Sequence, residues 1–156
     1  MKLYTRGRYA LRMMVAVARR SDGSDAVSLG TLASATMISR RYLEQVARRL
    51  REHSLLRAVS GRSGGYVLTR PPQQITVAEI FEASIGPISV VDCIRDPDHC
   101  LEAEFCECRW VYEQVNSGIL SVLDGLTLDA LASRGSARQG CRDYPSATHG
   151  CPTTGP

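Results

Sequence analysis

The sequence of 156 residues contains little that suggests a membrane or a secretion pathway. No apolar run approaches the roughly 18 residues that cross a bilayer. The chain opens with Met1-Lys2-Leu3-Tyr4 and lacks the apolar segment and cleavage site of a signal peptide. We therefore expect a cytoplasmic protein with no membrane partner, long enough for one domain and an accessory element.

Motifs of common enzymes are also missing. The glycine-rich stretch at 61–65 lacks the GxGxxG spacing of a dinucleotide-binding fingerprint, and no phosphate-binding loop occurs. No His and Asp constellation surrounds Cys106 and Cys108, which a thiol-based enzyme would use. We expect a protein that is not an enzyme and keep the thiol enzyme as the weaker hypothesis.

Net charge is small but unevenly distributed. Residues 1–74 hold 14 Lys and Arg against 4 Asp and Glu, whereas residues 75–156 hold 5 against 12. A concentrated positive field suits a polyphosphate partner, because each neutralised phosphate releases counterions. The charge of the first half therefore indicates a nucleic-acid partner, with a merely soluble basic surface as the alternative.

The basic half predicts two short helices joined by a tight turn, after a first helix over 5–20. Ser28 is a good N-cap for the first of the pair, a turn follows at 36–38, and Ser39 caps the second. The apolar positions of the second helix follow i, i+3, i+4, i+7 spacing: Leu43, Val46, Ala47 and Leu50. Two short helices joined this closely are typical of a helix-turn-helix.

The outer face of that second helix carries side chains suited to base edges. Arginine bonds guanine bidentately, glutamine suits adenine and glutamate accepts from cytosine. The alternative is a solvated face with an ion pair between Glu44 and Arg48. The candidate DNA-binding residues on this helix are Ser39, Arg40, Arg41, Glu44, Gln45 and Arg48.

Residues 55–59 and 66–69 have the pattern of two strands, and the glycines between them supply the positive φ angles of a hairpin turn. Such a hairpin is a wing that can lie against the DNA backbone, and Arg57, Arg62 and Arg70 give it charge. An ordinary hairpin is the alternative. The predicted fold class is mainly α with a small β-hairpin wing: a winged helix-turn-helix over 1–74 followed by a long dimerisation helix.

Residues 75–132 are predicted to form a linker helix, a cysteine loop and the dimerisation helix. Thr76 and Glu79 form a capping box, and the helix they open runs through Ala83 until Gly86-Pro87. A longer helix over about 109–123 has one apolar side, formed by Val111, Val115, Ile119 and Val122. A small winged helix cannot hide this stripe, so we expect a homodimer.

A last short helix is expected from Thr127 through Ala132. From Ser133 the chain is rich in Gly, Ser, Pro and Thr, which predicts a disordered tail over 133–156. Cys141 and Cys151 fall in this tail and are interpreted as spare thiols.

The cysteine loop spans 92–108 with the spacing Cys93-x6-Cys100-x5-Cys106-x-Cys108. Thiolate sulfur suits iron–sulfur clusters and zinc. Structural zinc more often uses Cys-x2-Cys pairs, and none occurs here. Spacing alone thus favours an iron–sulfur cluster, with zinc and reactive thiols as alternatives.

The fourth ligand stays open. Cys108 is only one residue from Cys106, and the two side chains diverge if helix begins there. The remaining candidates are His99, Glu104, Glu107 and a residue of a partner subunit.

Residues 1–132 resemble the family of winged-helix regulators that includes IscR, NsrR, RirA and CymR. The resemblance rests on three stretches, together with Gly86-Pro87-Ile88 and the three spaced cysteines. The stretches are Ile38-Ser39-Arg40-Arg41-Tyr42-Leu43-Glu44-Gln45, Gly61-Arg62-Ser63-Gly64-Gly65-Tyr66 and Ile75-Thr76-Val77-Ala78-Glu79-Ile80.

This resemblance implies a homodimeric DNA-binding transcription factor, a repressor, whose DNA affinity depends on a cluster that senses iron, redox state or nitric oxide. By the same resemblance Cys93, Cys100 and Cys106 ligate a 2Fe–2S cluster in preference to 4Fe–4S, and Arg41, Glu44 and Gln45 read bases. A zinc site or a cysteine thiol switch is the alternative to the cluster.

Three positions depart from the family pattern. IscR-like members place a histidine where this chain has Arg109, and NsrR-like members can use an acidic residue where it has Arg8. The wing arginine of IscR-like members is matched by Ser60, so we expect either that Arg62 takes its place or that reading of the minor groove is weakened.

Overall fold

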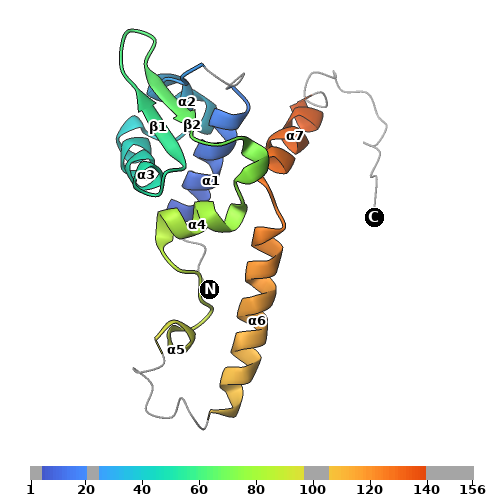
Figure 1. The fold of residues 1–156 in the computed structure, drawn as a ribbon. Coiled ribbons are helices and arrows are strands. Elements are labelled where there is room, and N and C mark those ends of the chain that lie inside the picture. Colours follow the sequence, from blue (N-terminus) through green and yellow to red (C-terminus); the bar gives the residue numbers. More distant parts are fainter. Residues whose placement is uncertain (1–4, 21–24, 97–105, 140–156) are drawn as a thin grey trace.

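Residues 5–20, 25–96 and 106–139 are described by a computed structural model (Figure 1). The helices are α1 (Thr5–Ala18), α2 (Leu29–Thr36), α3 (Arg40–Glu52), α4 (Val77–Ile85), α5 (Asp92–Arg95), α6 (Glu107–Asp124) and α7 (Leu128–Gln139). A 3-10 turn, η1 (Pro72–Gln74), precedes α4, and strands β1 (Leu56–Val59) and β2 (Gly65–Leu68) form an antiparallel hairpin. The predicted class, mainly helical with a hairpin wing, is confirmed.

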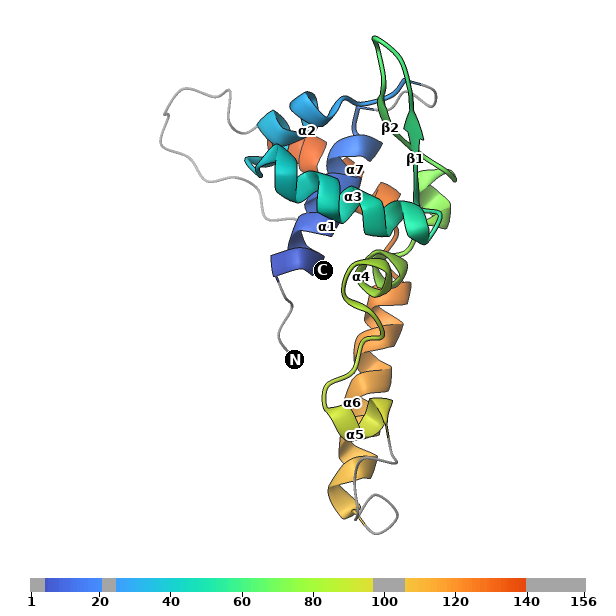
Figure 2. The ribbon, with the colours of Figure 1, turned by 90° about the vertical axis from the view of Figure 1, so that its left-hand side faces the viewer.

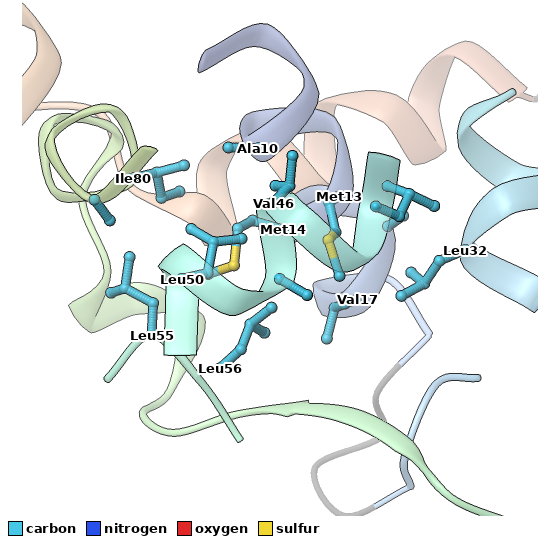
Figure 3. Packing of buried hydrophobic residues seen from close by; sticks show 14 of the residues in the cluster. Ala10, Met13, Met14, Val17, Leu32, Val46, Leu50, Leu55, Leu56 and Ile80 are labelled. Atoms are coloured by element: carbon cyan, nitrogen blue, oxygen red, sulfur yellow. The ribbon is translucent and has the colours of Figure 1, made fainter. Parts of the chain in front are cut away.

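α1 is the centre of the fold. It packs against α2, α3, α4 and α7, and its side chains Met13, Met14 and Val17 are fully buried. Figure 3 shows these residues among Leu32 of α2 and Leu50 of α3. Burial of each such side chain contributes about 1.5–3 kcal/mol, so this shared core fixes α2 and α3 relative to one another.

The predicted caps of the helix-turn-helix are present. The Ser28 side chain accepts the amide of Thr31, and the Ser39 side chain accepts that of Tyr42, at 3.1 and 3.4 Å. α2 ends at Met37, whose backbone is left-handed (φ 56°, ψ 36°). α3 therefore leaves the turn at a new angle and lies across one face of the module, with the hairpin rising beside its C-terminal end (Figure 2).

The wing is anchored to the segment before α2. Val27 exchanges two backbone hydrogen bonds of 2.9 Å with Tyr66 of β2. A Cβ at Gly65 would collide with the carbonyl of Val27, so this approach requires glycine. Within the hairpin loop only Gly61 has the positive φ that the sequence predicted for its glycines.

α4 begins with the predicted capping box, in which Thr76 and Glu79 each accept the other's backbone N–H. It crosses α1 closely at Gly7, where a Cβ would come within 2.8 Å of the Phe81 ring. The helix continues two residues beyond the predicted Ala83 and ends at Gly86, whose φ is 87°. Residues 86–96, which lead from α4 to Cys93 and are called the cysteine segment below, thus begin directly beneath the winged helix (Figure 1).

α6 projects away from the winged helix, which is formed by α1–α3 and the hairpin. α5 lies along the half of α6 that is farther from the winged helix (Figure 1). The chain then returns: Leu128 at the start of α7 is fully buried in the main core. α7 is held to α1 by Arg19, which donates to the carbonyls of Leu131 and Ala132 at 3.3 and 3.0 Å. The three-part division predicted from the sequence stays a prediction, although α4 and α7 pack on the core of the first part.

Several predicted boundaries were wrong. α1 ends at Ala18 and not at residue 20, and α6 begins at Glu107 and not at 109. α5 is a helical turn inside the segment predicted to be only loop. α7 runs to Gln139 and not to Ala132, because its first turns dock on α1 and η1 and support continuation. None of the helices in the described ranges is long and apolar enough to cross a membrane.

Candidate nucleic-acid interface

The outer face of α3 is available to a partner along its whole length. Its inner side chains are buried in the core, and Leu43 and Leu50 are fully so. The other side of the helix is solvent-exposed, as the sequence predicted for all of its candidate residues: Ser39, Arg40, Arg41, Glu44, Gln45 and Arg48. These six positions therefore share one accessible surface.

Their surroundings divide these side chains into two groups. Arg41, Glu44 and Gln45 form no ion pair within the described ranges. Arg48 instead donates to Glu52 at 3.0 Å, so the i,i+4 pair on this helix is Arg48–Glu52 and not Glu44–Arg48. Both members are more than half exposed, and such a pair contributes little to stability.

Arg40 leans back over α2. A Cβ on Gly30 would lie 3.0 Å from its Nη2 atom, and the Ser28 hydroxyl borders the same space. The guanidinium is thus carried toward the beginning of α2, where unpaired amides favour anions. This position is better suited to a backbone phosphate than to a base edge.

A second group of polar residues meets between α2 and the wing. Arg20, Ser28, Thr31 and Arg62 line one shallow hollow, with a volume of about 290 Å³. Two guanidinium groups from segments far apart in the sequence thus border the same space. The sequence singled out Arg62 but not Arg20, because only the pairing of Val27 with Tyr66 brings the wing to this side of α2.

The other wing arginines lie elsewhere. Arg70 donates to Glu79 at 2.8 Å, so it joins the end of the wing to the capping box of α4 and is not a free charge on the hairpin. Burial raises the pKa of Glu79, but the hydrogen bonds from Arg70 and Thr76 and the charge of Arg70 together bring it below its ordinary value. Arg57 is exposed on β1.

α3 is also tied to α4 from its inner edge. Arg49 donates to the backbone carbonyl of Ser84 at 3.4 Å, a contact between residues 35 positions apart. Because Ser84 precedes the end of α4 by one residue, α3 is linked to the start of the segment that leads to Cys93. Nothing in the local pattern around Arg49 distinguishes it from its neighbours, so this contact could not be predicted.

The described cysteines lie at the far end of the molecule from α3. Cys93 is on α5 and Cys106 is the N-cap of α6, and α5 packs against α6. Both are partly buried, whereas Cys108 is exposed. Cys100 lies outside the described residues, and among those described no three His, Cys, Asp or Glu side chains converge on one point.

The start of α6 separates the candidates for a fourth ligand. Cys106 has extended backbone and Cys108 is the second helical residue, so their side chains diverge, since residues two apart on a helix do not face each other. Arg109, at the family's histidine position, donates to Glu113 at 2.8 Å. Glu107 is exposed in the first turn, and Arg8 is exposed on α1.

The remaining candidates cannot be placed. His99 and Glu104 lie outside the described residues, as do the tail cysteines Cys141 and Cys151.

One buried polar side chain connects the cysteine segment to α6. Asn116 is 8% exposed on a helix that is otherwise open along this length, and its Oδ1 accepts the backbone N–H of Val90 at 3.1 Å. Val90 stands three residues before Cys93. Asn116 was not predicted to be a functional residue, because an asparagine at an inward position of an amphipathic helix resembles a break in the apolar pattern.

The apolar residues of α6 face two directions. Ile119, Leu120 and Leu123 pack against α4, together with Phe81 and Ile88. On another side, Val111, Val115 and Val122 are 47–63% exposed, so Ile119 does not belong to the exposed stripe as predicted. Gly118 has the matching helical spacing, and a Cβ there would meet nothing within 4 Å. The exposed stripe therefore consists of three valines, and Gly118 leaves an open space between Val115 and Val122.

A family model described as an iron-dependent transcriptional regulator, Rrf2, matches residues 3–134. The transcriptional regulator CymR of Bacillus subtilis is 35% identical over 133 residues, covering 85% of this chain and 91% of its relative. Among solved structures, that of B. subtilis CymR, titled the global cysteine regulator, has a TM-score of 0.71 and 34% identity, covering 86% of this chain and 98% of that one. T. potens IscR has a TM-score of 0.71 and 30% identity, covering 89% and 91%.

Proposed function

Because the chain belongs to the Rrf2 family of transcriptional regulators, we propose that it is a cytoplasmic, homodimeric repressor whose DNA affinity is set by an iron–sulfur cluster. Cys93, Cys100 and Cys106 would hold the cluster, 2Fe–2S in preference to 4Fe–4S. One observation carries the proposal. The chain has an exposed basic helix, α3, and it also has thiols at the end of α6 that lies farthest from α3.

The base-reading part of the proposal rests on the free side chains of α3. Arg41 suits guanine O6 and N7, Gln45 suits adenine, and Glu44 accepts from cytosine N4. All three are exposed and form no ion pair among the described residues. These side chains can therefore enter a major groove without breaking an ion pair within the described ranges.

Orientation on the duplex is assigned to phosphate contacts. Arg20 and Arg62 border one hollow with the hydroxyls of Ser28 and Thr31, and Arg40 leans toward the same helix start. Charge and hydroxyl donors at the beginning of a helix suit a backbone phosphate. These contacts give affinity without sequence preference.

The thiols fit a cluster by chemistry and by placement. Cys93 and Cys106 come from elements that pack against each other, and both are shielded in part from solvent. Thiolate donors suit iron–sulfur centres, and the start of α6 offers a partial positive charge to an anionic group. Loss of the bound cluster would be the signal for oxidation, nitric oxide or iron shortage.

The residues of the chain give a route from this group to the DNA. Val90 is held on α6 by Asn116, and α4 is held to α3 by Arg49. A change in the order of the cysteine segment therefore acts on α6 and α4 together. Such coupling is reciprocal, so DNA binding should also alter retention of the cluster.

A thiol switch or a zinc site is the second candidate, and one observation favours the thiol switch. Cys108 is exposed and diverges from Cys106, as a reactive thiol would, and the similar B. subtilis CymR is titled a global cysteine regulator. In that case Cys108 and not Cys106 should control DNA affinity.

Anaerobic purification followed by absorbance, iron and sulfide analysis distinguishes these functions. We expect visible absorbance with stoichiometric iron and sulfide, lost in Cys106→Ser and retained in the matched control Cys108→Ser. DNA affinity should change when the cluster is removed. A protein with one zinc and no sulfide, or a colourless protein whose DNA affinity follows Cys108 alone, would overturn the cluster proposal.

A further inference from the structure

Met37 occupies the turn between α2 and α3 in a conformation that suits glycine. Its φ of 56° and ψ of 36° are left-handed, and its amide donates to the Ala33 carbonyl at 2.9 Å to close α2. Glycine and asparagine adopt this geometry with least strain, and a long side chain is disfavoured. Glycine or asparagine at this position would therefore have a lower conformational energy than methionine.

The Met37 side chain does not compensate for this strain by packing. It is 86% exposed, more than any other large hydrophobic side chain of the described segments, whereas Thr36 and Ile38 on either side are buried. A strained residue whose side chain adds no internal contact indicates a role outside the fold.

Ser54, the second non-glycine residue with positive φ within the described ranges, shows the contrast. Ser54 has a φ of 55° at the opposite end of α3. It is polar, and its carbonyl accepts the hydroxyl of Thr69, which directly follows β2. Both residues thus have an internal contact through the backbone, but only Ser54 has a side chain suited to solvent.

The place of Met37 relative to α3 indicates what it meets. It stands two residues before Ser39, the N-cap of α3, and therefore lies next to the N-terminal end of α3, which carries Arg40 and Arg41. The N-terminal end of a recognition helix enters the major groove, so an outward side chain in the preceding turn lies beside the same base pairs. The apolar group on that groove surface is the C5 methyl of thymine.

We infer that Met37 is a specificity-determining residue that contacts a thymine methyl group at the edge of each half-site. This inference rests on the proposed function, since it assumes that α3 reads the groove. The flexible thioether fills irregular apolar gaps, so it can cover a methyl group beside the arginines. The expected preference is for T over C, A or G at that position, and for thymine over deoxyuridine.

The test removes one methyl group from the DNA and one side chain from the protein. A preferred duplex is first selected from random sequences with the full chain, and each thymine is then replaced by deoxyuridine. We expect one position in each half-site to lose about 3- to 5-fold in affinity, the size expected for burial of a single methyl group. In Met37→Gly that penalty should vanish, while the melting temperature rises because the left-handed strain is relieved.

Two further variants keep the result specific. Met37→Leu retains an apolar side chain and should keep the deoxyuridine penalty. Ser54→Gly relieves the same kind of strain away from the turn, and should raise the melting temperature with the penalty unchanged.

Two results overturn the inference while the proposed function stands. The first is a deoxyuridine penalty that persists in Met37→Gly, and the second is a penalty that disappears equally in Ser54→Gly. If no duplex sequence is enriched at all, the proposed function fails and the inference fails with it.

Discussion

The side-chain oxygen of Asn116 accepts the backbone N–H of Val90 at 3.1 Å, across 26 positions of sequence. This bond joins the middle of α6 to the segment that leads into α5 and Cys93. Asn116 is the one buried residue of α6. Since the remainder of that helix is exposed or partly exposed, the contact at Asn116 decides where the cysteine segment lies along it.

Replacement of Asn116 by leucine should release this segment. The Val90 N–H would lose its acceptor, at a cost of about 1–3 kcal/mol for a buried donor. We expect faster amide exchange at Val90 and its neighbours, and faster loss of iron from protein prepared without air. Asn116→Asp keeps an acceptor oxygen and is the matched control. Equal exchange rates in the leucine variant and the wild type would contradict this role.

Arg41→Ala and Arg62→Ala should weaken DNA binding in different ways. Loss of a bidentate base contact costs about 1–3 kcal/mol and relaxes preference at one base pair. Loss of a phosphate contact at Arg62 or Arg20 weakens specific and random duplexes alike and reduces the salt slope by about one. Fluorescence anisotropy on both duplexes at several salt concentrations separates the two. Equal losses on both duplexes for Arg41→Ala would remove it from base reading.

The exposed valines of α6 predict how the proposed dimer is lost. Val115→Glu places a charge in the apolar stripe and should raise the dimer dissociation constant about 100-fold, because an uncompensated buried charge costs about 3 kcal/mol or more. Analytical ultracentrifugation measures this directly. Ser117 is exposed and lies off the stripe, so Ser117→Glu should leave the dimer intact. A wild-type protein that stays monomeric at micromolar concentration would contradict the dimer itself.

The capping box of α4 predicts an acid-dependent stability. Thr76→Ala should lower the free energy of unfolding by about 1 kcal/mol through loss of the cap. The lowered pKa of Glu79 means that its charged form stabilises the fold at neutral pH, and that this contribution is lost as pH falls through that lowered value. Urea unfolding from neutral to acidic pH should therefore show wild type above Glu79→Gln near neutrality and the two converging in acid. A constant difference would contradict the linkage.

Local chemistry explains why most of the elements were predictable. Ser28, Ser39 and Thr76 each cap a helix through a contact three residues away, so the pattern that predicts the cap also contains its partner. The same holds for the hairpin, whose strands are separated by a short glycine-rich loop. The exposed face of α3 followed from the spacing of its apolar residues.

The features that escaped prediction depend on distant partners. Arg70 looked like a wing charge until Glu79 was found beside it, and Arg20 joined the wing only through the pairing of Val27 with Tyr66. α7 extends through a segment of loop-like composition because it docks on α1. Contacts of this kind leave no periodic signal in the sequence.

Among the residues that the structure describes, the backbone bonds that fasten α6 to the winged helix lie just beyond its C-terminal end. Backbone bonds of 2.9 Å join Leu126 to Val77 and Leu128 to Ile75, whereas Cys106 stands at the opposite end. With 18 residues the helix acts as a lever about 27 Å long. A tilt of about 5° at the fastened end moves the tip by roughly 2 Å, more than separates a good hydrogen bond from a broken one. Conversely, a displacement of about 2 Å at the Cys106 end reaches the winged helix as a rotation of about 5°, so a change among the thiols would be transmitted as a change of angle and not of distance.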